Sequence, residues 1–179
     1  MQHVFLMPYD PRWPGEFAGE ASLVTGAMGN LLVEIHPIGS TAVPGLAAKP
    51  IIDLLAAVSD VSLLDEKTAT MGALGYEAMG EFGMPGRRYF RKDDQNGCRI
   101  HQVHAFHAGS PQIARHLAFR DFMRAHPEFA SQYEALKRNR LADQYPHDIG
   151  SYTNGKDDFI QEMDVKAAAW QKARAAASR

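Results

Sequence analysis

Hydrophobic positions along the chain follow two different periods. In the first thirty residues, and again after residue 110, they recur every three or four positions, which is typical of amphipathic helices. Between these segments lie short apolar runs bounded by glycine, proline and asparagine, which is the pattern of strands. The expected helices span residues 11–30, 59–74, 110–125, 127–144 and 157–177, and the expected strands span residues 32–38, 49–58, 76–79, 87–92 and 98–106.

The order of these elements predicts an α+β fold. We expect a mixed β-sheet with flanking helices, followed by a C-terminal helical part. The two strands between residues 87 and 106 are joined by a turn that ends in Asn96-Gly97, which predicts an antiparallel hairpin. Length predicts one domain over residues 1–179, with the sheet core in about residues 1–108 and the helical part in about residues 110–179.

Composition narrows the function classes. A chain of 179 residues with 45% hydrophobic and 22% charged residues is globular. Its net charge of -2 creates no overall field that attracts nucleic acid or an anionic membrane, so an anion site must be a local group of basic residues. The one cysteine, Cys98, cannot form an intramolecular disulfide, and we expect this small side chain to be buried or half-buried.

Targeting signals are missing from the pattern. The N-terminus has no basic segment followed by an apolar stretch, and no apolar run approaches the roughly 18 residues of a membrane span. We therefore expect a cytoplasmic protein that does not contact a membrane. The sequence leaves the oligomeric state open.

A single carboxylate, Asp53, stands inside the second long apolar run. An unpaired buried charge costs several kcal/mol, so Asp53 must face a metal, a basic residue or solvent. The preceding run ends at Gly39-Ser40, and a glycine followed by N–H and hydroxyl donors can cradle a phosphate. Ser40 and Thr41 are therefore candidate phosphate ligands, and Lys49 is a candidate point charge beside them.

The same turn and strand carry a further hypothesis about a metal. A strand carboxylate that faces a phosphate-binding turn can hold a divalent cation such as Mg²⁺ between the protein and a nucleotide. Asp53 is then the metal ligand, and a nucleotide or another phosphorylated small molecule is the expected partner.

A known family signature covers this part of the chain. The sequence reads Ile38-Gly39-Ser40-Thr41-Ala42-Val43-Pro44-Gly45-Leu46 and then Lys49-Pro50-Ile51-Ile52-Asp53, which resembles the GrpB family. The likeness continues through Pro8-Tyr9-Asp10-Pro11, Trp13, Arg99, His101, His104, Phe119-Arg120-Asp121, His126-Pro127 and Tyr152-Thr153-x-x-Lys156. This family is related to the nucleotidyltransferases and is sometimes fused to dephospho-coenzyme A kinase. The resemblance implies a nucleotidyltransferase-like fold and a transferase of nucleotidyl or phosphoryl groups.

The chain departs from the carboxylate pattern that the superfamily likeness implies. Leu55 stands where the second strand carboxylate belongs, and the strand over residues 98–106 has no Asp or Glu. That strand offers His101 and His104 as candidate catalytic groups beside Asp53. Because they are three residues apart, they point to opposite faces of a regular strand, and each could equally be a histidine satisfied by its neighbours.

Basic residues supply the remaining candidates. Arg88 and Arg91 belong to a local positive group on the strand over residues 87–92, although a solvated sheet face gives the same pattern. The resemblance adds Arg120, and it adds Tyr152 with Lys156 near the start of the last helix, where they could close over a ligand phosphate. By contrast, the run that contains Glu134, Lys137 and Arg138 predicts a solvated helix face.

Two functions follow from this pattern. The first is a nucleotide-directed transferase with one metal, held chiefly by Asp53. The second is a nucleotidyltransferase-fold module that has lost part of its catalytic set and binds a nucleotide or another phosphorylated small molecule. Leu55 favours the second function, and the carboxylate retained inside an apolar strand favours the first.

Overall fold

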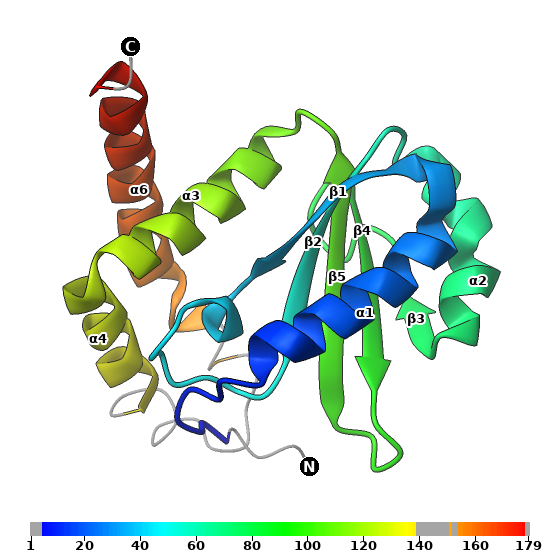
Figure 1. Ribbon diagram of the computed structural model, residues 1–179, viewed down its shortest axis with the longest axis horizontal. Helices are drawn as coiled ribbons and strands as arrows, with labels where there is room; N and C mark the ends of the chain where they lie inside the picture. Colours follow the sequence, from blue (N-terminus) through cyan, green and yellow to red (C-terminus); the bar gives the residue numbers. More distant parts are fainter. Residues whose placement is uncertain (1–4, 139–150, 152–153, 178–179) are drawn as a thin grey trace.

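The computed structural model describes residues 5–138, 151 and 154–177 as a mixed sheet with helices around it (Figure 1). The sheet has five strands in the order β1-β2-β5-β4-β3. Their bounds are β1 Leu32–Ile38, β2 Ile52–Val58, β3 Tyr76–Ala78, β4 Arg87–Asp93 and β5 Arg99–His107. Strands β2 and β5 run parallel, and the other neighbours are antiparallel. The predicted mixed sheet of an α+β fold is confirmed.

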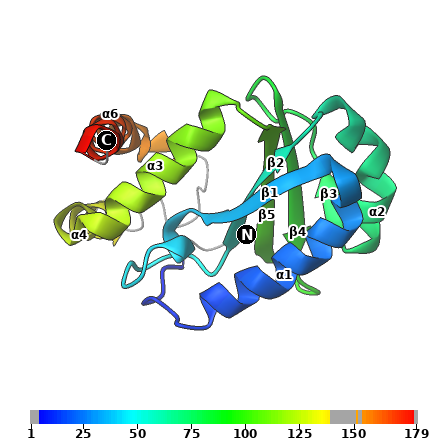
Figure 2. The ribbon, with the colours of Figure 1, turned by 45° about the horizontal axis from the view of Figure 1, so that its top comes forward.

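One face of the sheet packs against the N-terminal helix. Helix α1 (Trp13–Met28) lies along this face, and the short helix α2 (Thr68–Ala73) lies beside its far end (Figures 1 and 2). Leu54, Val103 and Phe90, which are neighbours in the register of β2, β5 and β4, are buried here with Val24 of α1. Each fully buried aliphatic or aromatic side chain stabilises the fold by about 1.5–3 kcal/mol.

The opposite face is only partly covered. Leu55, Ala57 and Phe106 are buried there against Ile113, at the start of helix α3 (Pro111–Ala125). Residues two apart on a strand share a face, so Asp53 lies on this face with Leu55. We call this the open face of the sheet, and it positions the candidate site.

The C-terminal helices form their own hydrophobic cluster beside the sheet. Helices α3, α4 (Pro127–Leu136) and α6 (Asp157–Ala177) gather on one side of the molecule in both views (Figures 1 and 2). Their buried core includes Phe122, Tyr133 and Met163, and it also includes Val43 and Leu46. These last two residues belong to the loop between β1 and β2, so that loop joins the sheet to the helices.

Most predicted elements agree with the structure. Strand β1 and helices α3 and α6 match their expected bounds. Helix α1 begins later because Asp10 caps the preceding turn, where its carboxylate accepts from the Arg12 amide at 2.9 Å. The expected helix over residues 59–74 is instead a 3₁₀ segment, η3 (Ser62–Lys67), followed by α2. The expected helix from residue 127 is described only to residue 138.

The structure also bears on the exposure of Cys98 and on membrane-spanning helices. Cys98 is exposed, so its expected burial is wrong: it follows a tight turn in which its amide donates to Asp94 Oδ1 at 2.8 Å. Within the described part of the chain, no helix combines the length and the apolar character needed to cross a membrane.

Candidate functional site

Gly39 and Asp53 meet at the end of β1. Gly39 has φ of +74°, in the left-handed region that favours glycine. A Cβ atom on Gly39 would lie 2.4 Å from Asp53 Oδ2, so only a glycine admits the carboxylate at this distance. The predicted pairing of a Gly-Ser turn with a strand carboxylate is present in the structure.

The residues after Gly39 form the 3₁₀ turn η2 (Ser40–Ala42), and its two hydroxyls have different roles. Thr41 is buried, and its Oγ1 donates to the Ile51 carbonyl at 3.1 Å, so it holds the turn against the strand. Ser40 Oγ instead accepts from Lys137 Nζ at 3.2 Å. Ser40 therefore faces the candidate site, whereas Thr41 is structural.

Lys137 is the residue that the sequence pattern misplaced. The expectation of a solvated face is wrong for this lysine, because only 3% of it is exposed. Its ammonium also donates to the Ala47 carbonyl at 2.5 Å and lies 4.7 Å from the centre of the Tyr133 ring. The neighbouring Glu134 accepts from the Ala47 amide at 3.0 Å, so the end of α4 grips the loop between β1 and β2 at two points.

A signal for Lys137 does exist in the sequence. It follows Tyr133 by four residues and Phe129 by eight, so it falls on the apolar face of α4 rather than the opposite one. Cationic residues on an apolar face are buried only with specific partners.

Three lysines gather around the Gly39-Ser40 turn, and we call Lys49, Lys137 and Lys156 the lysine cluster. Burial, and then repulsion from Lys156, lowers the pKa of Lys137 to about 7. Burial, and then repulsion from Lys49, lowers the pKa of Lys156 to about 8, while Asp53 opposes this shift. Burial also lowers the pKa of Lys49, again opposed by Asp53. Three amino groups therefore lie near the turn: Lys137 contacts Ser40, and Lys49 and Lys156 lie near Asp53.

His104 is the histidine that the fold brings to Asp53. Its Nε2 lies 3.6 Å from Asp53 Oδ1, on the open face. On the other side of the ring, Nδ1 lies 3.5 Å from Arg87 Nη1. Because a guanidinium can only donate, Nδ1 of the neutral ring is the acceptor, and the ring proton on Nε2 points toward Asp53.

His101 lies on the opposite face, so the structure removes it from the candidate site. Its register partner on β4 is Lys92, and both point toward α1. Its Nε2 is 3.8 Å from Glu20 Oε2, and Glu20 also accepts from Lys92 Nζ at 2.9 Å. Burial lowers the pKa of His101, which is consistent with its place under the helix.

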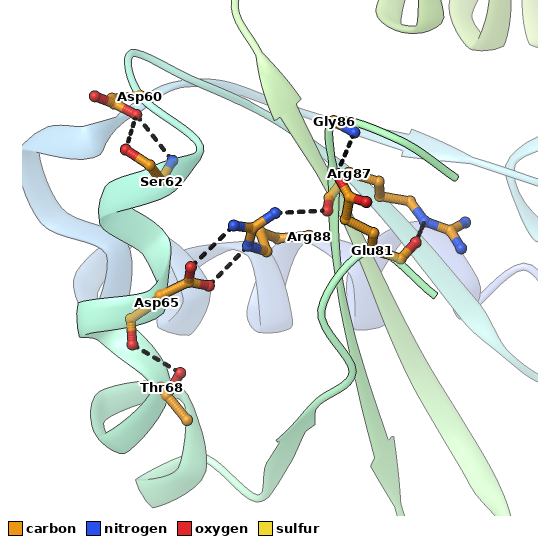
Figure 3. A network of polar contacts seen from close by, with 8 residues as sticks. All are labelled: Asp60, Ser62, Asp65, Thr68, Glu81, Gly86, Arg87 and Arg88. Carbon is orange, nitrogen blue, oxygen red and sulfur yellow. Dashed lines mark hydrogen bonds and ion pairs between the residues drawn. The ribbon is translucent and has the colours of Figure 1, made fainter. Parts of the chain in front are cut away.

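The two predicted arginines of β4 also lie outside the site. Arg88 points toward η3, where it donates to both oxygens of Asp65 at 2.7 and 2.9 Å (Figure 3). Arg91 is on the open face, but it lies two strands away from β2, and its Nε donates to Glu77 Oε2 at 2.5 Å. Arg87, which was not predicted as a site residue, is the arginine of this strand that contacts His104.

The remaining predicted site residues are Arg120, Lys156 and Tyr152. Arg120 Nη1 donates to the Pro37 carbonyl at 3.0 Å, and Arg124 Nε donates to the Ala42 carbonyl at 2.8 Å. Both arginines therefore fasten α3 to the segment that forms the turn. Lys156 belongs to the lysine cluster, and Tyr152 lies outside the described residues.

The described side chains around Asp53 lack the oxygen ligands that a magnesium site needs. Leu55 is fully buried on the face where a second carboxylate would have to stand, and His104 directs an N–H toward Asp53. Magnesium prefers several oxygen ligands, and among the described residues no three His, Cys, Asp or Glu side chains form a group that could hold a metal. These residues do not fit a magnesium clamp, so we derive no step through a metal.

A small cavity adjoins the turn from the α1 side. It has a volume of about 110 Å³, and Asp53, Thr41 and Arg124 line it together with Trp13 and Phe17. Pockets that hold small-molecule ligands usually measure about 300–1,000 Å³, so this cavity is too small to enclose a nucleotide. Asp53 keeps 22% of its side chain exposed, so the turn is reached from solvent.

Comparison with solved structures defines the class of fold. The structure of Cid1 in complex with its short product ApU superimposes with a TM-score of 0.53 at 13% identity, over 84% of this chain and 48% of Cid1. The chain therefore has a nucleotidyltransferase-like fold. The crystal structure of the conserved protein GrpB from Enterococcus faecalis matches at a TM-score of 0.85 and 40% identity, over 91% of this chain and 96% of that one.

Sequence comparison gives the family. A family model described as GrpB protein matches residues 3–166, and this chain belongs to that family. UPF0157 protein YqkA of Bacillus subtilis is 41% identical over 171 residues, which is 96% of this chain and 49% of YqkA. The chain thus spans about half the length of YqkA and of Cid1.

Proposed function

We propose that this chain binds a nucleotide or another phosphorylated small molecule at the Gly39-Ser40 turn, through the lysine cluster and without a bridging metal. The observation that carries the proposal is the 3.2 Å contact of Lys137 Nζ with Ser40 Oγ at the turn, with Lys156 near Lys137 and both Lys49 and Lys156 near Asp53. Three amino groups near one turn are complementary to a group with several negative charges, such as a di- or triphosphate.

The energetics of the lysines support this function over a structural role. Burial holds the pKa of Lys137 and Lys156 far below the ordinary lysine value, so the fold is less stable for keeping them together. A bound polyphosphate would restore their charged forms and offset the repulsion. Residues that lower the stability of a fold in this way are common at functional sites.

The Gly39-Ser40 turn is compatible with a bound polyphosphate. Gly39 leaves room for the Asp53 carboxylate, and η2 begins with Ser40 directly after it. Backbone N–H groups at a turn of this kind favour an anion. The nucleotide as ligand class is further supported by Cid1, a protein of the same fold whose structure holds the product ApU.

The alternative is a nucleotidyl or phosphoryl transferase with one metal on Asp53. The observation that favours it is the contact of Asp53 with the Gly-Ser turn, which is the arrangement that a bridging cation would need. The buried Leu55 and the N–H of His104 count against it.

Calorimetric titration of ATP, with Mg²⁺ and with EDTA, tests both functions. We expect wild-type protein to bind ATP in EDTA, and Lys137→Met to weaken binding at least about tenfold because a charged hydrogen bond contributes about 1.5–3 kcal/mol. Lys172→Met, an exposed lysine near the end of α6, is the matched control and should bind as wild type does.

The same titration separates the alternatives. Asp53→Asn should bind ATP at least as tightly in EDTA, because it removes a negative charge that faces the phosphates. Binding that requires Mg²⁺ and disappears in Asp53→Asn would favour the transferase. Absence of ATP binding under both conditions would refute the proposed function.

A further inference from the structure

A row of aromatic rings lies on the open face, and one of its rings, His104, is beside the candidate site. His104, which contacts Asp53, lies 5.2 Å from Tyr89 between ring centres, and Tyr89 lies 5.3 Å from Phe82 in a stacked arrangement. On the other side, His104 lies 6.3 Å from His116. We call Phe82, Tyr89, His104 and His116 the ring row.

The outer end of the row is exposed. Tyr89 is buried beneath Phe82, whereas Phe82 itself is 58% exposed. One face of the Phe82 ring therefore covers Tyr89, and much of the rest is available to a ligand.

The backbone holds Phe82 in a conformation that aromatic residues rarely adopt. Its φ of +45° lies in the left-handed region, and such strain costs on the order of 1–3 kcal/mol. Arg87 fixes it: Nη2 donates to the Phe82 carbonyl at 2.8 Å, and Nε donates to the Glu81 carbonyl at 3.2 Å. The Gly86 amide donates to Glu81 Oε1 at 2.7 Å and closes the loop (Figure 3).

Arg87 connects this loop to the candidate site. The same guanidinium that holds the Phe82 carbonyl contacts His104 and lies 5.1 Å above the Tyr89 ring. The group that holds the Phe82 carbonyl thus also contacts His104, the histidine beside Asp53. A glycine at residue 82 would relieve this strain, so the ring stands here at a cost to the backbone.

We propose that Phe82, supported by Tyr89 and Arg87, is a stacking platform for a planar ring of the ligand, in a nucleotide its base. This inference rests on the proposed function, because the ring row supplies the base contact and the lysine cluster supplies the phosphate contact of one ligand. An exposed aromatic face stacks on any nucleobase, so the platform selects nucleotides over plain phosphates without selecting among bases.

Titration of two probes, ATP and inorganic tripolyphosphate, tests the platform in EDTA. Phe82→Gly removes the ring and suits the positive φ, so the loop keeps its backbone conformation. We expect Phe82→Gly to weaken ATP binding about 5- to 150-fold, the range of base stacking on an aromatic side chain, and to leave tripolyphosphate binding unchanged. Phe82→Tyr should restore ATP binding, and Leu63→Ala, an exposed leucine of η3, is the control.

The outcomes separate the platform from the proposed function. If wild-type protein binds tripolyphosphate as tightly as ATP, or if Phe82→Gly binds ATP as wild type does, the platform is refuted and the phosphate site stands. If wild-type protein binds neither probe, the proposed function and the platform are both refuted.

Discussion

Replacing Lys137 by methionine should change how the stability of the protein depends on pH. An unfolded lysine titrates near 10.5, and in the fold the pKa of Lys137 falls to about 7. Between these values the unfolded chain holds a proton that the folded chain has lost, so the free energy of unfolding rises with pH, by up to about 1.4 kcal/mol per pH unit. From about pH 7 to about pH 9 the contribution is roughly 2 kcal/mol, because the folded lysine is still half protonated at the start.

The Lys137→Met variant lacks this contribution. It no longer carries the penalty of a buried charge, but it leaves the Ala47 carbonyl without its donor, at a cost of about 1–3 kcal/mol. We therefore expect the variant to be more stable than wild type near pH 6 and to lose that advantage by about pH 9.

Urea unfolding between pH 6 and pH 9 measures the effect, and tryptophan fluorescence is the signal. Lys172→Met is the control, because its side chain is exposed on α6 and its curve should run parallel to that of wild type. If the curves of Lys137→Met and wild type run parallel instead, Lys137 does not titrate between these pH values, and the account of the buried lysine is refuted.

Three further substitutions test other parts of the structure. Gly39→Ala should destabilise the fold by at least about 1–2 kcal/mol from its left-handed backbone alone, and more from the contact with Asp53, in thermal or urea unfolding. Gly15→Ala, at a helical position with open space around the new Cβ, should instead stabilise it by about 0.5–1 kcal/mol, and the opposite signs are the check. Glu20→Ala leaves the ammonium of Lys92 under α1 without its carboxylate, so unfolding should require about 3–5 kcal/mol less free energy. A loss below about 1 kcal/mol would show that water reaches this ion pair.

The sequence predicted the parts of the site that depend on local physics. A carboxylate inside an apolar strand is unusual, and a glycine ends the preceding strand, so Asp53 and Gly39 stood out without any structure. The period of two also placed His101 and His104 on opposite faces, as the structure confirms.

Residues whose role depends on distant partners could not be predicted. Which histidine faces Asp53 follows from the parallel pairing of β2 with β5, which brings residues about fifty positions apart into register. Lys137 is buried by the loop at Ala47, ninety residues earlier in the chain. Arg88 is taken from the site by Asp65 of η3, and no pattern within β4 reveals that partner.

The hydrogen bond between the Ala47 amide and Glu134 makes that amide a probe of local opening. The Ala47 amide is buried and donates to Glu134 Oε2, so its hydrogen exchanges with solvent only when the end of α4 separates from the loop between β1 and β2. Its exchange rate therefore measures a sub-global motion that requires no unfolding of the sheet. A ligand that contacts both Ser40 and Lys137 would slow that single amide more than it slows the strands, and NMR could follow the two rates in one sample.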